Sequence, residues 1–210
     1  YDFADILPAD YIKNLEANLP EKLFKRFVMN SHEIAEGLVY HEYNEAQHVI
    51  EPFEIPSGWE RGFILDHGFR NPTAVLWYAI NYDGDIILYD EHYESEKAVS
   101  YHAEVIKKRY HENGLADPSI FSLTQSRGAY LFSIADEYRE YGINLVPAQR
   151  EEEYAAIARV NEFFKAGRIK VFRTLVHARQ LIHWRRVADD IDTGLVPQDI
   201  AEVLIRSPVL

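Results

Sequence analysis

The sequence predicts an α/β domain in which helices cover both faces of a mixed β-sheet. Three apolar segments typical of strands follow one another closely between residues 62 and 93, and an Asp-Gly pair between the last two is a strong hairpin signal. From residue 97 onward, helical and strand patterns alternate. Antiparallel strands followed by such alternation indicate a mixed sheet, and 210 residues with 47% apolar content can bury its core.

The elements are predicted in chain order from periodicity and turn residues. Strands are expected at 62–67, 73–81 and 85–93, then a helix at 97–111, a strand that ends at 117, a helix at 130–141, a strand at 143–146, a helix at 151–165, a strand at 169–172 and a helix at 174–184. Residues 1–30 have the pattern of short helices, and a short strand is expected at 38–40. We place a domain boundary near residue 55, so that 1–55 form an entry segment and 56–210 the main domain.

Composition limits the chemistry that is available to the chain. It contains no cysteine, which suits a reducing cytosol and leaves only oxygen and imidazole groups as metal ligands. No segment approaches the roughly 20 apolar residues of a membrane span. The chain opens on Tyr1 without a signal-peptide pattern, and we interpret it as a domain of a longer protein.

The formal charge of -12 is unevenly distributed. Residues 1–117 carry 10 basic and 22 acidic side chains, whereas residues 118–210 carry 12 of each. Within the second part, residues 159–186 hold eight basic side chains and one acidic one, a local charge of +7. This basic block could face phosphates, or it could be a solvated surface that balances the acidic half.

Two predicted strands end in aspartate, at Asp66 and at Asp117. If these strands are parallel neighbours, their carboxyl ends lie side by side in the crevice where open α/β sheets bind ligands. A hard-cation site needs a third acid, and a helix that begins near Pro197 offers Asp199 and Glu202 on one face. Taken singly, each acid could instead be a helix cap, a turn residue or a favourable first-turn charge.

These residues resemble the nuclease domain of the large terminase subunit of tailed double-stranded DNA phages, which has a ribonuclease H-like fold. The resemblance covers most of the chain. It includes "GFILDHGFRNPTAVLWYAINYDGDIILYDEHY" for the first strands, "LADPS" for the second acidic motif and "YREYGINLVPAQREEEYAAIARVNEFFKAGRIKVF" for the central strand-helix-strand stretch. "LPADYIKNLEANLPEKLFKRFV" and "EGLVYHEYNEAQHVIEPFEIP" resemble the end of the preceding motor domain and the linker.

The resemblance implies a divalent-metal-dependent endonuclease that cuts concatemeric viral double-stranded DNA during genome packaging. Such sites bind two Mg²⁺ or Mn²⁺ ions about 3.5 to 4 Å apart. Asp66 would bridge the ions, while Asp117 and Asp199 would each hold one. Glu202 would be auxiliary, because Gln198 stands where the family has its first C-terminal acid.

Other polar residues are weighed against this set. Glu91, at the end of the third strand, is a secondary candidate for a metal ligand. His67 alternates to the opposite face from Asp66, so we expect it to pack rather than bind metal. The acids Asp189, Asp190 and Asp192 are read as a loop.

The resemblance also implies partners: double-stranded DNA, the capsid portal protein, the small terminase subunit and the ATPase motor domain of the same chain, in the host cytoplasm and without a membrane. DNA contacts are expected from Arg168, Lys170, Arg185 and Arg186, on the same side of the sheet as Asp66.

Two alternatives stay open: another ribonuclease H-like nuclease or resolvase, and a non-catalytic module that docks on portal or DNA. An actin-like or sugar-kinase ATPase, whose strand order is similar, is set aside because those folds normally need a second half and over 300 residues. The sequence also has no P-loop motif, so it does not bind nucleotide in the P-loop manner.

Overall fold

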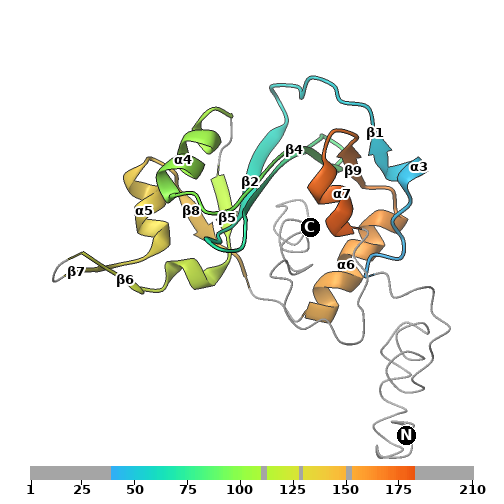
Figure 1. The fold of residues 1–210 in the computed structure, drawn as a ribbon. Coiled ribbons are helices and arrows are strands. Elements are labelled where there is room, and N and C mark those ends of the chain that lie inside the picture. The colour runs from blue at the N-terminus through green and yellow to red at the C-terminus, as the bar shows by residue number, and fades with distance from the viewer. Residues whose placement is uncertain (1–38, 110–112, 128–129, 150–152, 183–210) are drawn as a thin grey trace, which may run out of the picture.

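The structure, a computed structural model, describes residues 39–109, 113–127, 130–149 and 153–182 (Figure 1). Its helices and strands are α3 (Glu45–His48), β1 (Val49–Ile50), β2 (Glu60–Asp66), β3 (Thr73–Ile80), β4 (Ile86–Glu94), α4 (Val99–Lys107), β5 (Asn113–Ala116), the 3₁₀ helix η3 (Pro118–Phe121), β6 (Gln125–Arg127), β7 (Tyr130–Phe132), α5 (Ile134–Glu140), β8 (Leu145–Pro147), α6 (Glu153–Lys165), β9 (Ile169–Phe172) and α7 (Val176–Ile182). No helix in these ranges is both long and apolar enough to cross a bilayer.

Seven strands form one mixed sheet in the order β1-β9-β4-β3-β2-β5-β8. The central strands β2, β3 and β4 are antiparallel, as predicted, and the Asp83-Gly84 turn joins the last two. Strands β5, β8, β9 and β1 add in parallel on the two sides. Strands β2 and β5 are parallel neighbours, which is the condition under which Asp66 and Asp117 lie side by side.

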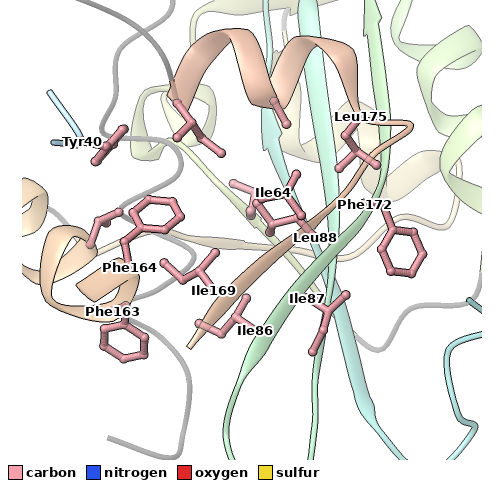
Figure 2. Packing of buried hydrophobic residues seen from close by; sticks show 14 of the residues in the cluster. Tyr40, Ile64, Ile86, Ile87, Leu88, Phe163, Phe164, Ile169, Phe172 and Leu175 are labelled. Carbon is pink, nitrogen blue, oxygen red and sulfur yellow. The ribbon is translucent and has the colours of Figure 1, made fainter. Parts of the chain in front are cut away.

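Two apolar clusters cover the two faces of the sheet. The first lies under α6 and α7 and includes Leu115. Ile64 and Leu88 of the same cluster are seen in Figure 2. The second lies under α4 and α5 and includes Phe63, Leu65, Trp77 and Ala116. Neighbouring residues of β2 therefore enter opposite cores, so the sheet is the middle of three layers (Figure 1).

The structure corrects two predicted elements. Residues 39 and 40 form a bend rather than a strand, and both are buried while Asn161 donates to the carbonyl of Val39. The helix predicted from Tyr130 begins at Ile134, because Ser133 and Asp136 form a capping box there. Residues 130–132 instead pair with 125–127 in a separate two-stranded hairpin.

Residues 39–55 belong to the same sheet and core as the rest of the described chain. Strand β1 pairs with β9, and Val39, Tyr40 and Ile55 are buried in the first cluster. A boundary near residue 55 stays a prediction. The predicted helices within residues 1–30 and after Pro197 lie outside the described residues, as do Asp189, Asp190 and Asp192.

Close contact between β2 and β5 makes Gly114 a test of this pairing. A Cβ atom at Gly114 would lie 2.2 Å from Cζ of the fully buried Phe63. We expect Gly114→Ala to lower the free energy of unfolding by about 1 to 3 kcal/mol, as overpacking does, in urea titrations. In Phe63→Leu/Gly114→Ala the clash is relieved, so the double variant should lose less than the sum of the two single losses; strict additivity would contradict this account.

Candidate active site

Asp66 and Asp117 lie at the carboxyl ends of adjacent parallel strands. Leu65 pairs with Ala116 in the register of β2 and β5, so each aspartate follows one member of that pair. Both side chains are half-buried. The structure thus brings together two of the three acids predicted as metal ligands.

The two carboxylates also point to the same face of the sheet. Ile64 and Leu115, two residues before the aspartates, both belong to the cluster under α6 and α7. Because side chains alternate along a strand, Asp66 and Asp117 share that face. Asp117 uses Oδ1 to accept the backbone N–H of Ser119 at 2.7 Å, which caps η3 and fixes the orientation of the carboxylate.

Glu91, a secondary candidate for a metal ligand from the sequence, caps the N-terminus of α7. Its Oε1 accepts the backbone N–H of Val176 at 2.7 Å and of His177 at 3.0 Å, and Oε2 accepts that of Ala178 at 2.8 Å. Both oxygens thereby satisfy the first turn of α7, whose N–H groups have no partner within the helix. A metal ligand role for Glu91 would have to compete with this cap.

Tyr93 and His177 lie at the same end of the strands as Asp66. The sequence did not predict them as part of the site. Ala74 pairs with Asp66 on one side and with Tyr93 on the other. Burial and then the charge of Asp66 raise the pKa of Tyr93. The Tyr93 and His177 rings stack with centroids 4.6 Å apart, and Nδ1 of His177 lies 3.2 Å from Oε1 of Glu91. Only the tertiary fold reveals this group.

The opposite face behind Asp66 holds three histidines. His67 points away from Asp66 as expected, with its ring 5.7 Å from Tyr138 and 6.3 Å from His102 between centroids. His92 Nε2 lies 2.9 Å from His102 Nδ1. Burial lowers the pKa of His67 and of His92. These residues pack and hydrogen-bond on the α4 and α5 side of the sheet.

The remaining predicted site residues are placed as follows. Asp199, Glu202, Arg185 and Arg186 lie outside the described residues. Arg168 and Lys170 flank Ile169, whose strand neighbour Ile86 begins β4, so they lie at the opposite end of the strands from Asp66. Arg168 donates to the carbonyl of Gly84, and Lys170 to that of Gln47. The register separates them from Asp66 along the strands, and their contact with DNA stays a prediction.

The donor set fits a hard divalent cation in part. Asp66 and Asp117 supply the carboxylate oxygens that Mg²⁺ and Mn²⁺ prefer. Within the described ranges, no three histidine, aspartate or glutamate side chains come close enough to hold a metal ion. The other two predicted ligands, Asp199 and Glu202, lie outside these ranges.

Comparisons with solved structures give the fold. The chain matches the P22 large terminase nuclease domain with a TM-score of 0.65 and 16% identity, over 80% of this chain and 91% of that one. It has the fold of the large terminase nuclease domain. This is the ribonuclease H-like fold expected from the sequence, a mixed sheet between helices.

Two further structures share this fold. The large terminase of a thermophilic bacteriophage, in complex with ADP, matches with a TM-score of 0.66 and 15% identity over 97% of this chain. This chain spans about half of that protein, 53% of its length. The large terminase nuclease of thermophilic phage G20c, with bound zinc, matches with a TM-score of 0.50 and 13% identity over 80% of this chain and 98% of that one. No family model and no curated protein matches the chain.

The buried histidines predict that the fold loses stability in mild acid. His102 is fully buried, its Nε2 makes no hydrogen bond to a described residue, and burial, with His92 and His67 nearby, lowers its pKa to about 4. Since the unfolded chain binds this proton near the ordinary value of about 6.5, the free energy of unfolding should fall as the pH drops from about 6.5 to about 4. In urea titrations across this range, His102→Gln should show a shallower decline than wild type; an equal decline would contradict the assignment.

Proposed function

We propose that this chain is the nuclease domain of a large terminase, a divalent-metal-dependent endodeoxyribonuclease that cuts concatemeric viral double-stranded DNA during genome packaging. The observation that carries the proposal is the position of Asp66 and Asp117, on one face at the carboxyl ends of adjacent parallel strands. The shared fold of terminase nuclease domains supports it.

In this proposal Asp66 and Asp117 hold the metal, Asp199 completes the set and Glu202 is auxiliary. These residues would hold Mg²⁺ or Mn²⁺, which would supply activation of a water and stabilisation of charge on the leaving 3′-oxygen. The protein's own part is to fix two carboxylates on ordered strands. Because both faces of the sheet are packed, β2 and β5 cannot shift, and the backbones of the two aspartates stay in place.

The proposed partners are those that the resemblance to large terminases implies. Double-stranded DNA is the substrate, and the portal protein, the small terminase subunit and the motor domain of the same chain are the packaging partners. A non-catalytic docking module is the alternative. Metal-dependent nicking that requires Asp66 distinguishes the two, since docking needs no metal site.

Replacing Asp66 or Asp117 by asparagine, which removes the charge and keeps the shape of the side chain, tests the metal site. We expect Asp66→Asn and Asp117→Asn each to reduce Mn²⁺-dependent nicking of plasmid by more than about 100-fold, since residues that merely support a ligand already contribute 10 to 100-fold. Millimolar Mn²⁺ should raise the melting temperature of the wild type and not of these variants, because the ion stabilises only a fold that binds it.

Asp83→Asn is the matched control, because it removes one exposed acid from the β3–β4 turn at the far end of the strands. Nicking and the Mn²⁺ shift should persist in this variant. Full nicking by Asp66→Asn, in folded protein, would refute the nuclease assignment.

DNA binding is proposed for the basic block, above all for Arg185 and Arg186. Because the whole chain carries -12, binding should be weak, with few phosphate contacts and a slope of log K against log salt near about -3. Arg185→Glu/Arg186→Glu should reduce nicking while the Mn²⁺ shift in melting temperature is retained. Lys107→Glu/Lys108→Glu, on exposed positions at the end of α4, controls for the change in net charge. Equal nicking by both double variants would exclude the basic block as the DNA contact.

A further inference from the structure

The hydroxyl of Thr73 hydrogen-bonds the backbone of the turn that follows Asp66. Thr73 begins β3, is fully buried and sits across the β2–β3 connection. Its Oγ1 donates to the carbonyl oxygen of Gly68 at 2.7 Å and accepts the N–H of Gly68 at 3.3 Å. One side chain thus holds both polar groups of the residue that lies two positions after Asp66.

His67 links the same turn to α5 on the opposite face. Its Nδ1 lies 3.1 Å from the Tyr138 hydroxyl and 3.4 Å from Thr73 Oγ1. Tyr138 is fully buried, and burial raises the pKa of its hydroxyl, so this group stays a neutral partner. The residue next to Asp66 is therefore fixed from two elements, β3 and α5.

The rest of the connection leaves little freedom. A Cβ atom at Gly68 would lie 2.4 Å from the carbonyl oxygen of Asn71, so the turn folds tightly on itself. The backbone N–H of Glu96, just beyond β4, donates to the carbonyl of Phe69 at 2.8 Å. Hydrogen bonds therefore hold the chain at Gly68 and at Phe69, directly after Asp66 and His67.

We propose that Thr73 and the His67–Tyr138 pair are positioning residues that aim the Asp66 carboxylate at the metal shared with Asp117. The inference rests on the proposed function. None of the three side chains is a ligand: they lie behind Asp66, and they act on it through the backbone of residues 67 and 68. Groups that hydrogen-bond directly to metal ligands commonly contribute 10 to 100-fold to metal affinity, and these three act one step further out, through the backbone that holds Asp66.

Paired substitutions at Thr73 test the hydroxyl directly. Thr73→Val keeps the shape of the side chain and loses Oγ1, whereas Thr73→Ser keeps Oγ1. We expect Thr73→Val to raise the dissociation constant for Mn²⁺, measured by titration calorimetry, by about tenfold or more, and Thr73→Ser to stay within about twofold of wild type. Tyr138→Phe, which removes only the hydroxyl that His67 contacts, should raise it by a few fold.

A stability control separates positioning from general weakening. Ile86→Val shortens a buried side chain at the other end of β4 and should lower the free energy of unfolding by about 0.5 to 1.5 kcal/mol without changing the Mn²⁺ dissociation constant. The comparison is made between variants that lose the same free energy of unfolding. If Ile86→Val then weakens Mn²⁺ binding as much as Thr73→Val or Tyr138→Phe does, the positioning role is overturned. If Thr73→Val does not fold, the Tyr138→Phe result decides.

The inference and the proposed function fail in different ways. Absence of Mn²⁺ binding in wild type, or binding that survives Asp66→Asn, contradicts the proposed function. Mn²⁺ binding that is lost in Asp66→Asn but unchanged in both Thr73→Val and Tyr138→Phe overturns only the positioning role. In the expected case, nicking at limiting Mn²⁺ falls in Thr73→Val and recovers at saturating Mn²⁺, since the ligands themselves are intact.

Discussion

The parallel pairing of β2 with β5 is the constraint on which the candidate site depends. Asp66 and Asp117 are 51 positions apart in the sequence, and only the register that sets Leu65 beside Ala116 makes them neighbours. A slip by one residue would send either carboxylate into the opposite core. Two packed faces oppose such a slip, because Ile64 and Leu65 have to enter different clusters.

The two faces of the sheet serve different purposes around this pairing. The α6 and α7 side carries the acids, together with Tyr93, Glu91 and His177 at the same edge. The α4 and α5 side carries His102 and Tyr138, both buried, and burial shifts the pKa of each so that its ionisation is costly. The candidate ligands are therefore on one side of β2, whereas these two residues on the other side are uncharged at neutral pH.

Local sequence signals predicted much of this arrangement. Strands β2, β3, β4 and β9 were predicted to within a few residues, because apolar runs and the Asp83-Gly84 turn mark them. The adjacency of Asp66 and Asp117 was predicted only on the condition that their strands are parallel neighbours, which the pairing of β2 with β5 supplies. The β6–β7 hairpin was missed because its strands are short, and Tyr130 and Leu131 are exposed, so no core periodicity marks them.

Other features could not be predicted from periodicity. The cap that Glu91 provides to α7 joins residues more than 80 positions apart, and the contact of His67 with Tyr138 joins residues 71 apart. Each acid and histidine has ordinary local roles, so only the tertiary contacts select one. For the same reason, the sequence could not indicate that Arg168 and Lys170 lie at the other end of the strands from Asp66, which the register of β4 and β9 shows.

The cap on α7 also sets a length scale for the third acid. Because Glu91 fixes the start of this helix on the face that carries Asp66 and Asp117, the chain leaves Ile182 from a defined point. Asp199 follows 17 positions later. Seventeen residues span at most about 60 Å when extended, and about 26 Å even as a continuous helix. The cap on α7 therefore limits the proposed third ligand to a radius of about 60 Å around a fixed point, Ile182.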